Sequence, residues 1–366
     1  MKISIPRDAI LNPLAMVNNV IERRQTLPIL SNVLLSIEDN TLSLTGTDLE
    51  VELINKCTIE NTENTETTLP ARKFLDICKA LPDGANLEII LDQERAILKS
   101  GRSRFTLSTL SASEFPSIDA LISPFEFNIS QKIFKKLIDQ TQFCMAQQDV
   151  RYYLNGLMFE LSENQIIAVA TDGHRLAFCQ SEIDLLPTET RQVIIPRKAV
   201  NEISRLLEDS DDEVKVSLSE NHIRIEFKEV TFTSKLIDGK FPDYQQVIPQ
   251  NANNEIKSSR SNLHQAFNRT SVLSNEKYRG MRLQLSTNEL KATVHNPEQD
   301  EAEEVIEVNY SGDEFEIGFN VAYLLDALSA IKSDEVIIQL TDSNHSCLVF
   351  GVDDVDSKYV VMPMRL

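Results

Sequence analysis

The sequence predicts an α+β fold made of three copies of one domain, each copy containing two strand–helix–strands units. The segment at residues 195–242 repeats an earlier one, because Arg72-Lys73 matches Arg197-Lys198 at a separation of about 125 residues. A weaker third copy starts near Gly318 and runs to the end of the sequence. Repetition at a period close to one third of the 366 residues indicates three repeated domains.

The predicted domains span residues 1–122, 123–250 and 251–366. Their limits follow two linker-like stretches, Ser123-Pro124 and the polar run at 249–254. Proline and clusters of asparagine favour loops over helices and strands, so these stretches are suited to connect domains.

Each third opens with a short strand and an amphipathic helix, and we expect these helices at residues 7–21, 131–146 and 260–274. A pair of alternating strands follows, joined by turn-forming residues at 38–40, 162–164 and 286–288. Each third then supplies a second helix and further strands.

The second helices each show one apolar stripe, as expected for a helix that packs on a sheet. In the first copy, Phe74, Ile77, Cys78 and Leu81 recur at helical spacing. The later stripes contain Val200, Ile203, Leu206 and Leu207, and then Val321, Leu324, Leu325, Leu328 and Ile331. The opposite faces contain more basic than acidic residues: Arg72, Asp76 and Lys79 in the first copy, and Arg197, Asn201 and Arg205 in the second.

The bulk composition is that of an ordinary globular chain, with 42% hydrophobic and 25% charged residues. No apolar run reaches the roughly 18 residues needed to span a membrane, and the first residues do not resemble a signal peptide. The five cysteines are scattered without metal-binding spacing. Together these features predict a cytoplasmic protein with free, buried thiols and no membrane association.

The net charge of −20 argues against nucleic-acid binding if it is taken as a global sum. Basic helix faces within an acidic chain instead suggest that one surface is positive. Screening limits the influence of distant acids to about 8 Å at physiological salt, so such a surface could contact a phosphate backbone without reading sequence. The alternative is that these faces are ordinary solvated surfaces.

Ten segments, in order along the whole chain, resemble the bacterial DNA polymerase III β subunit family, the sliding clamps, and most closely those of gammaproteobacteria. They are RQTLPIL (24–30), LTGTDLE (44–50), PARKFLDIC (70–78), SGRSRF (100–105), QDVRYYLNG (148–156), ATDGHRLA (170–177), GKFPDY (239–244), LSNEKYRG (273–280), NPEQDEAEE (296–304) and VVMPMRL (360–366).

This resemblance implies that each chain is half of a head-to-tail dimeric ring, with helices inside, sheets outside and duplex DNA through the centre. It implies a replication processivity factor without catalytic activity of its own and without a cofactor. The partners implied are a second copy of the chain, double-stranded DNA of any sequence, a clamp loader, the catalytic subunit of DNA polymerase III, and other proteins with a clamp-binding motif, such as other polymerases, mismatch-repair proteins and ligase.

Three groups of residues carry over from the family. The DNA contacts are Arg24, Arg72, Gln148, Tyr152 and Tyr153, and the repeat adds Arg197 and Lys198. The groove for partner peptides comprises Leu154, Thr171, Gly173, His174, Arg175, Leu176, Pro242, Val247, Val360, Met362, Pro363, Met364, Arg365 and Leu366. The dimer interface joins Lys73, Arg95, Arg102, Arg104, Phe105 and Leu107 to Val272, Leu273, Asp300, Glu301, Glu303 and Glu304 of the other copy.

Three positions depart from the family pattern: Gln246, Asn344 and Tyr278 stand where an arginine, an apolar residue and a phenylalanine are expected. These departures bear on which peptides the groove prefers. They leave its existence unaffected.

Other functions fit parts of the sequence less well. Asp172 and His174 could suggest acid–base catalysis, but no nucleophile motif accompanies them, and the matching segment at 47–50 has no histidine. The acidic run at 298–304 could suggest a metal site, but it lacks the alternating ligands and glycine of a calcium loop. A peptide-binding hub without a DNA role is the remaining alternative.

Overall fold

The structure is a computed structural model that describes residues 2–22, 27–60, 63–92, 94–118, 125–162, 164–183, 190–250 and 254–365. The chain forms two compact units: unit 1 is Met1–Lys132 with Asn201–Leu236, and unit 2 is Ile133–Val200 with Ile237–Leu366. The division passes through α3 (Gln131–Asp139) and α4 (Arg197–Leu206).

Unit 1 contains two antiparallel sheets. The smaller has the strand order β1 (Lys2–Pro6), β6 (Asn86–Asp92), β7 (Arg95–Ser100), β8 (Ser103–Ser108). The larger has the order β5 (Thr65–Pro70), β2 (Asn32–Glu38), β3 (Thr41–Thr47), β4 (Val51–Thr58), β16 (Val230–Lys235), β15 (His222–Phe227), β14 (Glu213–Leu218), β9 (Phe125–Ser130).

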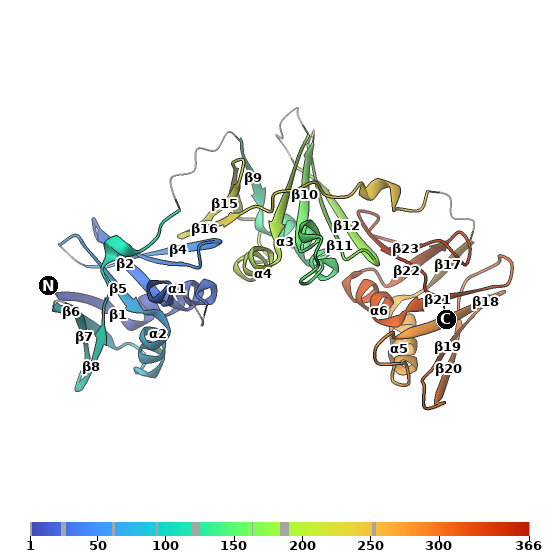
Figure 1. Ribbon diagram of the computed structural model, residues 1–366, viewed down its shortest axis with the longest axis horizontal. Helices are drawn as coiled ribbons and strands as arrows, with labels where there is room; N and C mark the ends of the chain where they lie inside the picture. Colours follow the sequence, from blue (N-terminus) through green and yellow to red (C-terminus); the bar gives the residue numbers. More distant parts are fainter. Residues whose placement is uncertain are drawn as a thin grey trace. The chain divides into compact units, whose positions relative to one another are not determined.

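Two helices of unit 1, α1 (Arg7–Val20) and α2 (Ala71–Ala80), lie side by side (Figure 1). Their apolar stripes are buried: Leu14 and Val17 of α1 and Phe74 and Cys78 of α2 are fully enclosed. The stripe predicted for the second helix is therefore confirmed. Short 3₁₀ turns, η1 (Pro28–Ser31) and η2 (Ala112–Glu114), complete this part of the unit.

Unit 2 repeats the plan. Its larger sheet has the order β13 (Arg191–Pro196), β10 (Gly156–Ser162), β11 (Gln165–Thr171), β12 (Arg175–Glu182), β24 (Ser357–Val361), β23 (Cys347–Gly351), β22 (Glu335–Leu340), β17 (Asn254–Ser259). Its smaller sheet has the order β20 (Glu301–Glu307), β19 (Glu289–His295), β18 (Gly280–Ser286), β21 (Phe315–Asn320). Helices α5 (Arg260–Ser271) and α6 (Val321–Ala330) pack together, and the 3₁₀ turns are η3 (Gln142–Cys144), η4 (Tyr152–Leu154) and η5 (Tyr244–Gln246).

Both eight-stranded sheets join strands from two of the predicted domains. In unit 1, β4 pairs with β16, and Glu52 lies opposite Thr233. In unit 2, β12 pairs with β24, and Leu176 lies opposite Val360. The predicted domain limits fall in or beside residues outside the described ranges, so they stay predictions. The sheets themselves run across these limits.

The predicted hairpin turns have a shared backbone signature. Asn40, Asn164 and Asn288 have φ values of 64°, 63° and 60°. This left-handed conformation is one that asparagine tolerates better than most residues, which is why it recurs at the same place in each copy.

Two predicted helices are too long. The helix expected at 260–274 is α5, which ends at Ser271. We expected a helix at 131–146, but α3 ends at Asp139. The Thr141 hydroxyl donates to the carbonyl oxygens of Leu137 (2.6 Å) and Ile138 (3.3 Å), which satisfies groups at the helix end. This local competition between side chain and backbone leaves no trace in the apolar spacing.

No helix in the described ranges is long and apolar enough to cross a membrane. Four of the five cysteines are buried, and Cys57 is partly exposed. All five are free thiols, as predicted. Burial raises the pKa of the Cys78 and Cys347 thiols to about 12, so both are held in the unreactive protonated form.

Candidate functional site

An apolar cluster lies at the junction of β12 and β24 in unit 2. Leu154, Leu176 and Val360, all predicted groove residues, are 1–2% exposed and pack in it together with Phe241 and Tyr244. Partly buried side chains cover this cluster, including Val247, Tyr153 and Ile248. The junction therefore has a fully buried apolar base covered by partly exposed apolar side chains.

The loop between β11 and β12 is held by its own side chains. The carboxylate of Asp172 accepts from the backbone N–H groups of His174 (2.9 Å) and Arg175 (3.1 Å). The Thr171 hydroxyl donates to the Arg175 carbonyl at 2.6 Å and accepts from the Gly173 N–H at 3.1 Å. These bonds order the predicted groove loop.

Gly173 occupies a left-handed backbone position that favours glycine. Its φ is 88°, and a Cβ at this position would lie 2.9 Å from Nη2 of Arg151. Arg151 in turn donates to Asp149 from Nε (3.0 Å) and Nη2 (2.9 Å). The guanidinium holds the pKa of Asp149 down to about 2 and packs the 149–151 segment against the loop.

Arg175 joins the loop to its surroundings. Its Nε pairs with Asp172 at 3.1 Å, its Nη1 bonds to Asp326 of α6, and its Nη2 donates to the Phe143 carbonyl at 3.0 Å. The guanidinium also lies 4.5 Å from the centroid of the Tyr323 ring. Only 13% of the Arg175 side chain is exposed, so its role is chiefly to fix the shape of the site.

The chain beyond β24 runs along this loop. The Met362 N–H donates to the His174 carbonyl at 2.9 Å, and the Met364 N–H donates to the Gly318 carbonyl at 2.8 Å. The His174 ring stacks on Tyr323 with centroids 6.4 Å apart. Met362 is 39% exposed, which offers a flexible thioether to a partner.

The predicted groove residues are thus largely brought together. Leu154, Leu176, Val247 and Val360 share the cluster, and Thr171, Gly173, His174 and Arg175 form the loop beside it. Pro242 is exposed next to buried Phe241. Met364 and Arg365 lie farther along the tail, beside a separate hollow, and Leu366 is outside the described residues.

The equivalent junction in unit 1 is built differently. Thr171 lies opposite Leu176 in one hairpin, and Thr47 lies opposite Glu52 in the other. Glu52 is only 4% exposed, and its carboxylate accepts from the Ile118 N–H at 3.2 Å. Glu52 in unit 1 therefore stands where Leu176 stands in unit 2. Its carboxylate bonds to the backbone, whereas Leu176 forms part of the base of the predicted groove.

The predicted DNA contacts fall on surface segments. Arg72 on α2 is 64% exposed and pairs with Asp76 at 3.4 Å. Gln148 and Tyr152 are exposed, and Tyr153 packs against the apolar cluster with its ring 5.9 Å from that of Tyr152. Arg24 lies outside the described residues.

Arg197 is more constrained than its repeat position suggested. Its Nη1 donates to the Met145 carbonyl at 2.7 Å, so the guanidinium holds the segment before η4. Lys198, its neighbour, is partly buried. A DNA contact by either residue stays a prediction.

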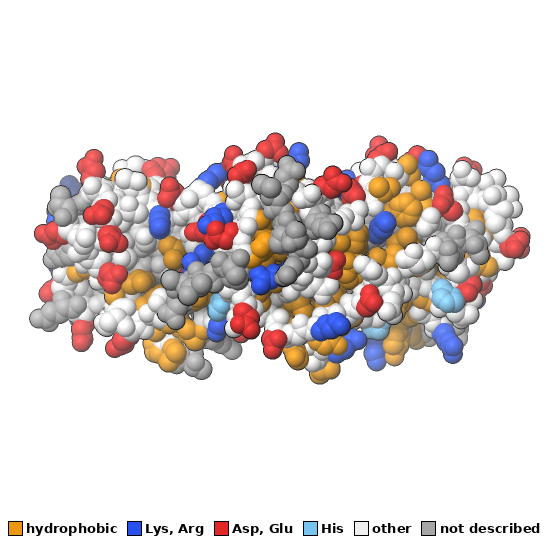
Figure 2. All heavy atoms as spheres, turned by 90° about the horizontal axis from the view of Figure 1, so that it is seen from above, with side chains coloured by type: hydrophobic (Ala, Val, Ile, Leu, Met, Phe, Trp, Pro, Cys, Tyr) orange, Lys and Arg blue, Asp and Glu red, His pale blue; other side chains and the backbone are white. Residues whose placement is uncertain are grey.

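The helices have a net positive charge, unlike the chain as a whole. Together α1 to α6 contain twelve Lys and Arg residues and five Asp and Glu residues, a net charge of +7 in a protein of −20. On the face drawn in Figure 2, acidic and basic side chains are interspersed among the coloured residues without a broad basic patch. The excess of positive charge therefore belongs to the helical elements.

The predicted dimer residues lie on or near two edge strands. β8 ends the smaller sheet of unit 1 and carries exposed Arg104 and partly buried Phe105. β20 ends the smaller sheet of unit 2 and carries Glu301, Glu303 and Glu304. Val272 is 75% exposed, whereas Leu107 is already buried within its own unit.

The alternative chemistries find no support in the described residues. Asp172 is committed to backbone N–H groups and to Arg175, and His174 stacks on Tyr323, so neither forms an acid–base pair. No group of three potential metal ligands occurs in the described ranges. Within the acidic run, Glu304 pairs with Arg269 at 2.6 Å and Glu303 with Lys291 at 2.7 Å.

Sequence reasoning missed Tyr323 and Asp326 of α6, which pack on His174 and Arg175. One signal was available: Asp326 is the single charged residue of α6, in an otherwise apolar helix. A lone carboxylate in such a helix often has a specific partner.

Comparisons with known proteins agree with this geometry. Models of the DNA polymerase III beta subunit match its N-terminal domain at residues 1–119, its central domain at 128–243 and its C-terminal domain at 245–365. The three predicted domain copies are thereby confirmed as three domains of this kind.

Individual relatives match over full length. The beta sliding clamp of Pseudomonas aeruginosa is 52% identical and that of Escherichia coli 50%, each covering 100% of both chains. A crystal structure of the Pseudomonas aeruginosa protein has a TM-score of 0.98 at 52% identity, and another, bound to griselimycin, has 0.97 at 52% identity, both covering 100% of both chains. Because three domain models and full-length relatives agree, the chain belongs to the DNA polymerase III beta subunit family, the bacterial sliding clamps.

Proposed function

We propose that this chain is a sliding clamp subunit, and that two copies close head to tail into a ring around duplex DNA. The helices line the hole, and the sheets form the outside. The observation that carries this proposal is the charge of the helices, +7 within a chain of −20. A phosphate near the helices feels these charges more than distant acids, because screening acts over about 8 Å.

The clamp holds DNA by linkage rather than by affinity. Several basic helix residues are partly neutralised one turn away, as in the pairs Arg72–Asp76 (3.4 Å) and Lys135–Asp139 (3.5 Å). Such pairs weaken each phosphate contact, and weak contacts let a ring slide. A strongly basic channel would instead slow it.

The two edge strands support closure of the ring. An edge strand exposes unpaired backbone N–H and C=O groups that another chain can use. β8 offers basic side chains and β20 offers acidic ones, so the two edges are complementary in charge. In a head-to-tail dimer this contact occurs twice.

The junction of β12 and β24 is the docking site for partner proteins. Its apolar cluster, the ordered loop at 171–175 and the exposed thioether of Met362 suit an extended segment with leucine and phenylalanine side chains. Two buried anchors contribute about 1.5–3 kcal/mol each, which is consistent with modest, exchangeable binding. We call this site the partner groove.

The partners follow from this role. They are the polymerase III catalytic subunit, other polymerases, mismatch-repair proteins and ligase, together with a loader that opens the ring. The sequence contains no nucleotide-binding motif, so the loader supplies the ATP chemistry and the clamp itself performs no catalysis. The clamp acts in the cytoplasm.

Primer extension on a long single-stranded template tests this function. The cognate polymerase should make short products alone and products of thousands of nucleotides when the chain and its loader are added. Omitting the loader should abolish the gain. Unchanged product length in the complete mixture would overturn the proposal.

A further inference from the structure

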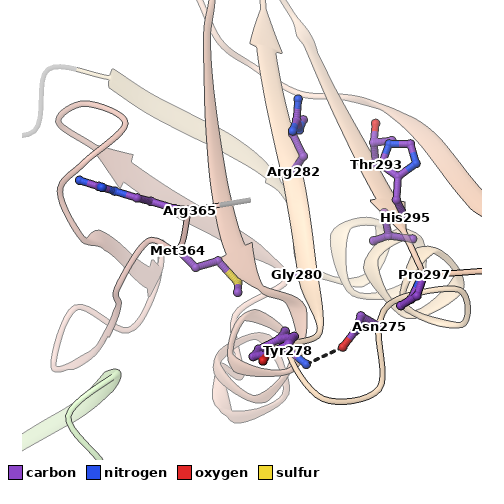
Figure 3. A pocket seen from close by; sticks show the side chains of 10 residues that line it. Asn275, Tyr278, Gly280, Arg282, Thr293, His295, Pro297, Met364 and Arg365 are labelled. Carbon is purple, nitrogen blue, oxygen red and sulfur yellow. Dashed lines mark hydrogen bonds between the residues drawn. The ribbon is translucent and has the colours of Figure 1, made fainter. Parts of the chain in front are cut away.

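A hollow of about 470 Å³ lies on the outward face of the smaller sheet of unit 2 (Figure 3). Gly280 and Arg282 of β18 and Thr293 and His295 of β19 line it, together with Tyr278 and Met364. Its volume is within the range of about 300–1,000 Å³ typical of ligand pockets. Met364 and Arg365, which also line the hollow, were assigned to the partner groove from sequence, whereas the lining residues on the two strands were not.

The hollow is shaped by a rigid loop and by a missing side chain. The side-chain oxygen of Asn275 accepts a hydrogen bond from the backbone N–H of Tyr278 at 2.9 Å. This bond fixes the loop that carries the tyrosine. Gly280 lies in the middle of the hollow and has no side chain to fill it. The Tyr278 side chain remains 57% exposed, and with the Met364 thioether it offers a platform for an aromatic ring.

The hollow is lined by basic and uncharged residues, and the two basic side chains on its strands each lie near an acid. Its lining residues include no Asp or Glu. Arg282 reaches Glu316 through Nη1 at 2.9 Å and is 39% exposed, and the exposed His295 has Nε2 3.7 Å from Glu301. The Arg365 side chain points away from the hollow in Figure 3 and is not counted. A guanidinium has five N–H donors, so Arg282 can bind a carboxylate beside Glu316.

The hollow continues the partner groove. The tail is fixed at Met362 by the His174 carbonyl and at Met364 by the Gly318 carbonyl. Two residues of extended chain span about 7 Å. Met362 beside the groove and Met364 beside the hollow are therefore about that far apart along the tail.

We propose that this hollow receives the flank of a partner segment whose anchors occupy the partner groove, and that the flank carries an aromatic side chain next to a carboxylate. The ring lies on Tyr278 and Met364, and the carboxylate faces Arg282 and His295. The hollow would therefore help to decide which partners hold the clamp most tightly. This inference rests on the proposed function of the groove.

Fluorescence anisotropy with synthetic peptides tests the proposal on the full chain. One peptide carries only the leucine and phenylalanine anchors. Two others add the flank Gly-Asp-Trp, at the amino or at the carboxyl end, and a fourth replaces the flank aspartate with asparagine. We expect one flanked peptide to bind about tenfold more tightly than the anchor peptide, and the asparagine version to lose about half of that gain on a logarithmic scale.

Variants locate the gain. His295→Glu and Arg282→Gln should reduce it to about twofold or less without changing the affinity of the anchor peptide. Thr287→Glu, which adds a negative charge at an exposed residue of the turn that follows β18, is the matched control and should keep the full gain. The proposal for the hollow alone would be overturned if the anchor peptide binds but neither flank increases its affinity. It would also be overturned if neither variant reduces the increase in affinity that a flank gives. If the anchor peptide does not bind at all, the proposed role of the partner groove is wrong, and the proposal for the hollow fails with it.

Discussion

The guanidinium of Arg175, at the start of β12, forms an ion pair with the carboxylate of Asp326 in α6. Arg175 belongs to the central domain by family match, and Asp326 belongs to the C-terminal domain. The same guanidinium orders the loop at 171–175 through Asp172. The contact therefore couples the shape of the partner groove to the packing of two domains.

Replacing Asp326 by alanine should weaken this coupling. Arg175 keeps Asp172 and the Phe143 carbonyl, and Asp326 is 48% exposed, so the cost should be about 1 kcal/mol. The midpoint of thermal unfolding should fall by about 2–4 °C, and the anchor peptide should bind several-fold more weakly. Glu314→Ala, an exposed residue outside the groove, is the control, and equal effects of both changes would contradict the assigned role.

Deletion of residues 362–366 should abolish partner binding. It removes the bond from Met362 to His174, the bond from Met364 to Gly318, and the exposed thioether. We expect the anchor peptide to bind at least about 100-fold more weakly, a loss of roughly 2.7 kcal/mol. Circular dichroism and sedimentation should show an unchanged fold and dimer, and a general loss of helicity would mean that the tail acts structurally.

Leu273→Asp should separate the ring into monomers. Leu273 is partly exposed and follows Val272, which is 75% exposed. A buried carboxylate there would lack a partner and would lie near the acidic run of its own chain. Sedimentation at nanomolar concentration reports the outcome. Val355→Asp, at a 58% exposed position away from both edge strands, should leave the dimer intact. A persistent Leu273→Asp dimer would remove this residue from the interface.

Glu52 should make the stability of unit 1 depend on pH. Burial raises the pKa of its carboxyl above the ordinary 4.5, against the opposing effects of the Ile118 N–H and Arg224. Because the folded state favours the protonated form, the stabilisation is present below the ordinary pKa and is lost as pH rises through the raised value.

Glu52→Gln removes that loss, since glutamine stays neutral and can still accept from Ile118. The variant should be more resistant to urea than the parent at pH 8, and the difference should shrink as pH approaches 4. Glu50→Gln, at an exposed neighbouring position, should show no such trend. A Glu52→Gln difference that is constant between pH 4 and 8 would contradict the account.

Local patterns could be predicted from the sequence, and long-range ones could not. The turns at Asn40 and Asn288 and the apolar stripe of α2 follow from residue types a few positions apart. The pairing of Leu176 with Val360 joins residues far apart in sequence and leaves no periodic signal. The groove residues were placed by family resemblance, and the structure adds the partners that hold them.

Two details could not be predicted for the same reason. The end of α3 depends on the Thr141 hydroxyl bonding back to Leu137, and the guanidinium of Arg197 turns to the Met145 carbonyl. Both are side-chain choices among backbone acceptors. A repeat comparison predicts position in the fold, but it does not predict which acceptor a polar side chain finds.

Retention on circular DNA tests the central claim most directly. The protein is loaded onto nicked circles by its loader, the complex is purified, and the DNA is then cut once with a restriction enzyme. A ring that is linked to DNA should stay on intact circles and run off the linear molecules within minutes, with little dependence on moderate salt. Equal retention on both forms, with a steep loss as salt rises, would show ordinary phosphate binding and would contradict the clamp account.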